Sequence, residues 1–135
     1  MAKSISKLKK ELDKWFSLYI RLRDANEFGM VQCFTSNRVY HYKSMHAGHF
    51  MSRKRLSTRW CEWNVQPQSP ADNLFNQGEQ YKFGLNLDAK YGDGAAEELQ
   101  IKSMQTLKMT RVDYDEKIGY YKDLVEKLKK EKGIE

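Results

Sequence analysis

The chain has three histidines, and all of them fall within nine residues, as His41, His46 and His49. Histidine titrates near neutral pH and binds metal ions, so two histidines close together are candidates for proton transfer or metal binding. Only Ala47 and Gly48 separate His46 from His49, and Gly48 permits the close approach of another backbone. We therefore expect His46 and His49 to carry chemistry. For His41 we favour a structural, hydrogen-bonded role.

Two asparagines follow the histidines. Asn64 lies in Trp63–Gln68, which reads as a short strand, and Ser69-Pro70 is typical of the start of a helix that carries Asn73. Hydrolysis of a phosphodiester at neutral pH needs a base that activates water and a cation that stabilises the leaving oxygen. The order His, Asn, Asn on strand, strand and helix is compatible with such a site.

Hydrophobic spacing divides the chain into helical ends and an irregular middle. Residues 1–26 carry apolar side chains at helical spacing among lysines, which predicts an amphipathic helix of about 20 residues. The middle is rich in β-branched and aromatic residues, which predicts short strands and long loops. Helical spacing returns from Ala71, and we expect these side chains to be available for packing: Leu74, Phe75, Tyr81, Phe83, Leu85 and Leu87.

A chain of 135 residues can bury one core but hardly two, so we expect a single domain over residues 1–135. Its parts are the N-terminal helix at 1–26, a central unit at 28–92 and a C-terminal helical segment at 93–135, whose last helix packs on the core or on a second copy.

Positive charge is concentrated in the middle of the chain. The formal net charge is +6, and no Asp or Glu occurs between Phe28 and Cys61. Such a run is often only a solvated surface, but here aromatic residues and histidines alternate with the cations, which favours contact with phosphates. The predicted DNA-binding residues are Arg38, Lys43, Arg53, Lys54, Arg55 and Arg59.

The sequence also indicates where the protein resides. No segment is apolar enough for a membrane span, and the lysine-rich start lacks the apolar region of a signal peptide, so we expect a cytoplasmic protein with no membrane partner. We expect Cys33 and Cys61 to be free thiols, because a single disulfide is uncommon in a chain without export signals.

The combined motif resembles the NinG (Rap) recombination endonucleases of phages, a branch of the HNH superfamily. The resemblance rests on elements that occur in order with matching gaps: His46–Arg53, Thr58-Arg59-Trp60, Asn64–Gln68, Asn73 and Gly78. It covers roughly residues 28–100 and leaves the terminal helices unexplained. It implies an α+β fold with a ββα-metal (HNH-like) nuclease core between flanking helices. It also implies a metal-dependent endonuclease that cleaves branched DNA, such as a Holliday junction or D-loop.

The resemblance implies roles for individual residues. His49 matches the general base, Asn64 matches the asparagine that braces the catalytic loop, and Asn73 matches a metal-ligand position. His46 stands where many members have an acidic metal ligand. Glu79 is a further candidate ligand, although an acidic residue near a helix start is also favoured by the helix dipole. The implied cofactor is Mg²⁺ or Mn²⁺, for which a His/Asn pair is a softer site than Asp/Asn.

Members that resemble this chain usually carry two C-x-x-C pairs that bind a structural zinc. Here those positions read Cys33, Ser36, Ser69 and Asp72, and one thiol with one carboxylate does not complete a tetrahedral zinc site. We therefore expect the domain to fold without structural zinc. Cys61 lies outside this spacing and is expected to be an apolar substitute.

We consider three functions for a chain with these sequence features. The first is the DNA endonuclease, for which a homodimer would match the twofold symmetry of a four-way junction. The second is a non-catalytic DNA-binding module derived from an HNH nuclease, which keeps the basic surface. The third, a structural phage or host component, leaves the element from His46 to His49 without a purpose.

Overall fold

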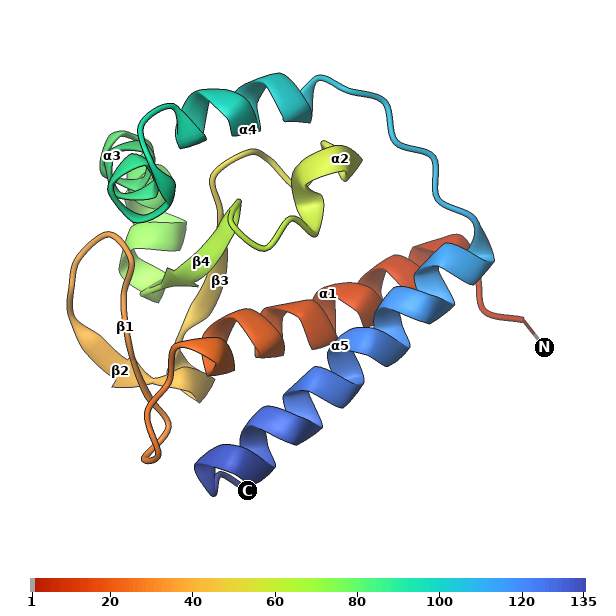
Figure 1. Ribbon diagram of the computed structural model, residues 1–135, viewed down its shortest axis with the longest axis horizontal. Helices are drawn as coiled ribbons and strands as arrows, with labels where there is room; N and C mark the ends of the chain where they lie inside the picture. Colours follow the sequence, from red (N-terminus) through yellow and green to blue (C-terminus); the bar gives the residue numbers. More distant parts are fainter. Residues whose placement is uncertain (1) are drawn as a thin grey trace.

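The computed structural model describes residues 2–135, in which two long helices pack beside two small antiparallel sheets (Figure 1). The α+β class expected from the sequence is confirmed. Among residues 2–135, no helix combines the length and the apolar character that a bilayer span requires.

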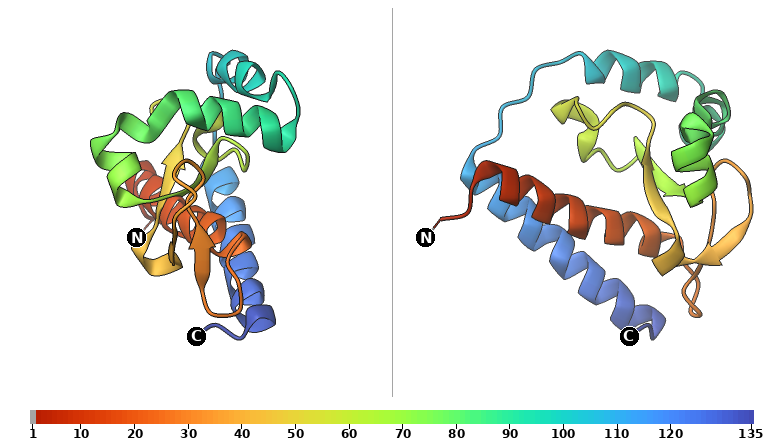
Figure 2. Two further views of the ribbon diagram at one scale, coloured as in Figure 1. Left: turned by 90° about the vertical axis from the view of Figure 1, so that its left-hand side faces the viewer. Right: turned by 180° about the vertical axis from the view of Figure 1, so that it is seen from behind.

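The two long helices, α1 (Ile5–Arg23) and α5 (Arg111–Lys132), lie side by side and run in the same direction (Figures 1 and 2). Their starts carry the capping groups that the orphan amides of a first turn need: Ser4 for α1, and a reciprocal capping box of Thr110 and Asp113 for α5. At the other end, Lys132 Nζ donates to carbonyl oxygens of Leu22, Arg23 and Ala25 at 2.7, 3.0 and 2.6 Å.

Apolar side chains join the two helices along their length. The ring of Phe16 meets that of Tyr121 edge to face at a centroid distance of 4.9 Å, and Leu12 and Ile20 are fully buried in the same cluster with Tyr114. The last helix therefore packs on α1 of its own chain, which is one of the two alternatives left by the sequence.

The sheets lie between the terminal helices along the chain. Strands β1 (Met30–Gln32) and β2 (Val39–His41) form one hairpin, and the turn η1 (Tyr42–Ser44) leads into β3 (His46–His49). Strand β3 pairs with β4 (Val65–Gln68) in antiparallel register, with His46 opposite Gln68 and His49 opposite Val65. The connection between β3 and β4 contains the short helix α2 (Leu56–Arg59).

Helical elements follow β4. They are the π-helical turn η2 (Ala71–Phe75), the 3₁₀ turn η3 (Gln77–Glu79), α3 (Gln80–Tyr91) and α4 (Ala95–Ser103). Phe83 and Leu87 of α3 are fully buried with Leu99 of α4, so the expected packing of these two α3 residues is confirmed.

The expected packing of the other four apolar residues was wrong. They are exposed by 60% (Leu74), 81% (Phe75), 80% (Tyr81) and 52% (Leu85). Helical spacing alone misleads here because the chain between β4 and α3 is a π turn followed by a kink. The π turn carries Leu74 and Phe75. Tyr81 and Leu85 are exposed because they lie on the face of α3 opposite the buried Phe83 and Leu87.

Candidate catalytic site

His49 is the last residue of β3, and the structure holds its ring in one orientation. Its Nε2 atom lies 2.9 Å from the carbonyl oxygen of Arg59. Because a carbonyl can only accept, Nε2 of the neutral ring carries the hydrogen and Nδ1 is left as the proton acceptor. Burial lowers the pKa of His49 below its usual value, and the Arg59 carbonyl only partly opposes this. The ring is therefore in its basic form at neutral pH.

A small cavity of about 140 Å³ lies beside His49. It is lined by Ala47 and His49 of β3, Asp13, Phe16 and Ser17 of α1, and Arg53. Asp13 accepts hydrogen bonds from Arg53 at 2.7 Å, from the Arg59 side chain at 2.6 and 3.2 Å, and from Trp60 Nε1 at 2.9 Å.

Asp13 remains ionised in this setting. Its burial raises the pKa, but the hydrogen bonds and charges of Arg59 and Arg53 outweigh burial and lower the pKa below its usual value. A carboxylate tied to two guanidinium groups thus fixes α1 against the loop that follows His49.

Asn64 braces the loop between β3 and β4. Its side chain is fully buried, accepts from the Met51 amide at 2.8 Å, and donates to the carbonyls of Met51 at 3.2 Å and Thr58 at 2.9 Å. One side chain therefore holds both ends of the segment that supplies Arg53 and ends near the Arg59 carbonyl. These hydrogen bonds match the bracing role expected for Asn64.

His46 and Asn73 meet on the other side of the hairpin. Asn73 Nδ2 lies 3.1 Å from His46 Nδ1, so the structure joins the two residues predicted to share a metal site. Side chains alternate between the faces of a strand, and a Cβ atom at Gly48 would lie 1.9 Å from Gln68 Oε1. Gly48 and His46 thus face Gln68 and the following turn, whereas Ala47 and His49 face α1.

The donor set near His46 tests whether a divalent cation fits. Among residues 2–135 there is no group of three or more His, Cys, Asp or Glu side chains placed to hold a metal ion. An imidazole and an amide supply two neutral ligands, and Mg²⁺ sites commonly keep several waters and use substrate phosphates. The two side chains are hydrogen-bonded to each other, so a cation there would need oxygens of water or substrate to complete its coordination. Glu79, partly buried in a left-handed conformation at the start of α3, is the nearest acidic candidate in the sequence after Asn73.

The four positions that correspond to the zinc-binding cysteines of similar proteins lie close together. Cys33 Sγ accepts from the amides of Ser36 at 3.4 Å and Ser69 at 3.2 Å, and lies 3.8 Å from Asp72 Oδ2. Burial raises the pKa of the Cys33 thiol, but these hydrogen bonds lower it more, to below the usual value. Ser69 Oγ accepts from the Asp72 amide at 3.2 Å, as a side chain at the start of a helix commonly does.

Cys33 and Cys61 are both free and buried, in separate clusters, and Cys61 packs with Phe83 and Leu87 as the expected apolar substitute. That the domain folds without zinc remains a prediction.

Most of the predicted DNA-binding residues are exposed, whereas Arg59 is held by contacts within the protein. Arg38, Lys43, Lys54 and Arg55 are exposed, and the Arg53 side chain is 60% exposed although it pairs with Asp13. Arg59 differs, because its side chain is 15% exposed, bonds to Asp13 and lies 5.0 Å from the ring of Trp60. Its guanidinium supports the loop and has little surface left for DNA.

Sequence reasoning missed two residues that shape the site. Asp13 looked like a polar position of an amphipathic helix, and only the tertiary contact with Arg53 and Arg59 distinguishes it. Gln68 is fully buried and donates to Thr35 Oγ1 at 3.0 Å and to the Gly78 carbonyl at 2.8 Å. Two sequence features pointed to Gln68: it ends the Asn64–Gln68 element, and Gly48 on the paired strand leaves room for its amide.

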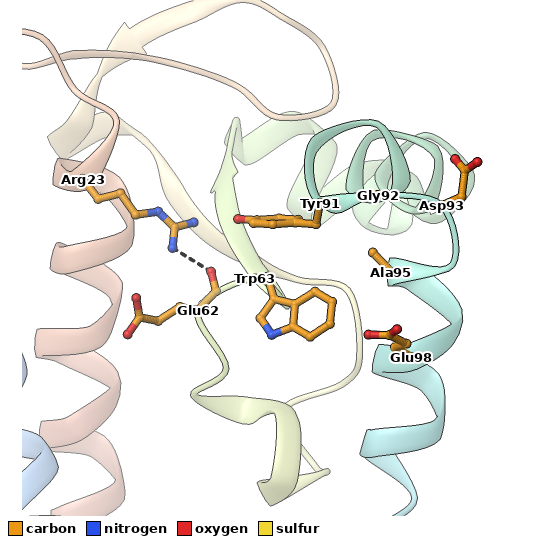
Figure 3. A pocket seen from close by; sticks show the side chains of 8 residues that line it. All are labelled: Arg23, Glu62, Trp63, Tyr91, Gly92, Asp93, Ala95 and Glu98. Carbon is orange, nitrogen blue, oxygen red and sulfur yellow. Dashed lines mark hydrogen bonds between the residues drawn. The ribbon is translucent and has the colours of Figure 1, made fainter.

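A separate open pocket of about 450 Å³ lies where the end of α1 meets the α3–α4 turn (Figure 3). Trp63 and Tyr91 form its aromatic walls, and Arg23 donates to the Glu62 carbonyl at 2.6 Å. None of the residues predicted to be catalytic or metal-binding lines this pocket.

Comparison with known proteins gives one result. No curated protein and no solved structure matches the chain. Residues 1–131 match the family described as bacteriophage lambda NinG protein, so the match includes both terminal helices, which the resemblance in the sequence left unexplained. The chain belongs to the bacteriophage lambda NinG protein family.

Proposed function

We propose that this chain is a metal-dependent DNA endonuclease that hydrolyses phosphodiesters in branched DNA, such as a Holliday junction or D-loop, during phage recombination. The observation that carries the proposal is the setting of His49. Its Nε2 is held by the Arg59 carbonyl, its pKa is lowered by burial, and Nδ1 remains to accept a proton. The order β3, β4 and a following helix supports an HNH-type ββα-metal core.

In this proposal His49 Nδ1 takes a proton from water, and the resulting hydroxide attacks phosphorus while the bond to the leaving oxygen breaks. Arg53 attracts the phosphate to the cavity, and Asn64 keeps the loop and the Arg59 carbonyl in place. The proposed holders of Mg²⁺ or Mn²⁺ are His46, Asn73 and Glu79. A cation there would supply positive charge for the leaving oxygen.

The base and the proposed cation ligands lie on opposite faces of β3, which restricts how DNA can approach. β3 pairs only with β4, so its other edge is unpaired within the described residues. A phosphodiester placed along that edge could reach His49 from one face and His46 from the other. We therefore place the scissile strand along the outer edge of β3.

A non-catalytic DNA-binding module is the second candidate. The specific observations that favour it are the missing three-ligand cluster among residues 2–135 and the separation of His46 from His49 by the strand. The basic residues Lys54 and Arg55 would serve that function equally well because they remain exposed.

The deciding experiment is cleavage of labelled linear, forked and four-way DNA by the purified protein with Mg²⁺, Mn²⁺ or EDTA. We expect metal-dependent cleavage that His49→Ala abolishes while DNA binding is retained. His41→Ala is the matched control, because His41 Nδ1 only accepts from the Lys43 amide at 3.2 Å. Full activity of His49→Ala removes His49 from the mechanism, and a wild type that cuts none of these DNAs favours the binding module.

A further inference from the structure

An apolar, aromatic protrusion marks the turn between β4 and α3. Phe75 and Tyr81 are exposed by 81% and 80%, and Leu74 and Leu85 by 60% and 52%. Tyr81 and Leu85 are one turn apart on α3 and therefore share a face. Single exposed apolar residues are ordinary on a protein surface, but a group that includes two aromatic rings suggests a binding surface.

The backbone that presents these rings has an unusual conformation. The π turn η2 ends in Phe75, and Gln77, Gly78 and Glu79 then adopt positive φ values of 53°, 74° and 48°. Left-handed conformations of residues other than glycine are unfavourable and persist only where the surroundings impose them. Gln68 imposes this one, since its fully buried side chain donates to the Gly78 carbonyl.

A polar cavity of about 530 Å³ is lined by the residues that follow the two rings in sequence, whereas the rings themselves lie outside its lining. Arg38 and Lys82 line it, together with the amide side chains of Asn37, Asn76 and Asn86. Its acidic residue, Asp72, is 8% exposed and already accepts from Thr35 at 2.5 Å and Asn76 at 3.3 Å. Because Asn76 donates to Asp72 and Asn86 donates to the Phe34 carbonyl at 2.8 Å, the cavity offers a phosphate group mainly its two cations, Arg38 and Lys82.

The chain connects the rings to the cavity directly. Asn76 follows Phe75, and Lys82 follows Tyr81, so each aromatic residue is next to a cavity-lining residue. Flat rings beside cationic and amide side chains are the combination by which proteins bind single-stranded nucleic acid: the bases stack on the rings and the backbone phosphates meet the cations. These charges interrupt the apolar surface that a protein partner would cover, so the combination favours nucleic acid.

We propose that Phe75, Tyr81 and the adjoining cavity with Arg38 and Lys82 form a binding site for unpaired nucleotides of DNA. This inference rests on DNA as the substrate of the proposed function and adds a reason for preferring branched DNA. Bases of an intact duplex are stacked on each other, whereas bases at a fork or an opened branch point present a free face to the rings. Asn73 lies two residues before Phe75, so such a site adjoins the proposed cation ligands.

The test measures equilibrium binding, in EDTA to prevent cleavage, to a DNA fork with single-stranded arms and to a duplex of the same length. Phe75→Ala and Tyr81→Ala are compared with Phe28→Ala, a matched control because Phe28 is also an exposed phenylalanine, at 74%, on the loop before β1. We expect each site variant to bind the fork roughly tenfold more weakly, a typical loss for one base–aromatic stack. Duplex binding, and both affinities of Phe28→Ala, should stay as in the wild type.

Cleavage of the same fork by the wild type with Mg²⁺ or Mn²⁺ separates the two proposals. If the wild type cleaves but Phe75→Ala and Tyr81→Ala bind the fork normally, the nucleotide site is refuted and the endonuclease stands. If the variants lose fork binding but the wild type never cleaves, the nucleotide site stands and the endonuclease fails. Equal losses for fork and duplex, or a change from dimer to monomer in sedimentation of Phe75→Ala, would also refute the site.

Discussion

Replacing Asn64 tests whether one buried side chain holds the loop that presents the candidate site. Asn64→Ala removes three hydrogen bonds, to the Met51 amide and to the carbonyls of Met51 and Thr58. Each is worth about 1 kcal/mol net, and the Met51 amide is left without its partner, so we expect a loss of about 2–4 kcal/mol. Since small domains have about 5–15 kcal/mol of stability, the variant should still fold.

Asn64→Asp sharpens the test because it keeps the shape and one hydrogen bond. The carboxylate can still accept from the Met51 amide, but its second oxygen replaces the amide group that donates to the Thr58 carbonyl at 2.9 Å. Two acceptors then face each other in a buried site, so at neutral pH this variant should be less stable than Asn64→Ala.

Urea unfolding followed by circular dichroism measures both effects. Asn73→Ala serves as the control, because Asn73 is partly exposed and is hydrogen-bonded to His46 at 3.1 Å. It should cost less than about 1 kcal/mol. An Asn64→Ala loss no greater than that of Asn73→Ala would refute the bracing role of Asn64.

Four other perturbations probe neighbouring parts of the molecule. Burial lowers the pKa of His49 in the folded protein below 6.5, so the unfolded chain binds a proton first as the pH falls. The free energy of unfolding should therefore decrease below about pH 6.5. His49→Gln should make this pH dependence shallower in urea titrations at a series of pH values. Gly48→Ala places a Cβ atom 1.9 Å from the buried Gln68 Oε1 and should lower the free energy of unfolding by about 1–3 kcal/mol. In a double-mutant cycle, Gln68→Ala should destabilise the Gly48→Ala variant less than it destabilises the wild type. Replacing Arg53, Lys54 and Arg55 with alanine should lower the slope of log DNA affinity against log salt by about one unit for each phosphate that no longer meets a cation; an unchanged slope places the DNA surface elsewhere. Thermal denaturation should be unaffected by EDTA if the hydrogen bonds around Cys33 replace a structural zinc, whereas stoichiometric zinc in elemental analysis and unfolding on chelation would contradict this.

The helices at the two ends of the chain were predictable because their signals are local. Helical spacing of apolar residues predicted the helices at both ends, and the structure begins α5 at a capping box of Thr110 and Asp113. The parallel packing of these helices was not predictable. It depends on contacts such as Lys132 with the end of α1, between residues that are far apart along the chain.

Burial between β4 and α3 could not be predicted from residue type. Leu74, Phe75 and Tyr81 look like core residues, but the three left-handed residues before α3 change the direction of the chain. Two of those residues are Gln77 and Glu79, which carry no sequence signal for this conformation because glycine is the residue usually found there. The buried amide of Gln68, which stabilises the kink, lies on the preceding strand.

The relation between His46 and His49 is the main result that spacing alone did not predict. The sequence made them look like one cluster, but an extended strand places residues three apart on opposite faces. Gly48, on the same face of β3 as His46, packs on Gln68. Ala47 and His49, on the other face, line the cavity with α1. The proposed base and the proposed cation ligands are therefore held by different parts of the fold: α1 and the β3–β4 loop support His49, whereas η2 supports His46 through Asn73.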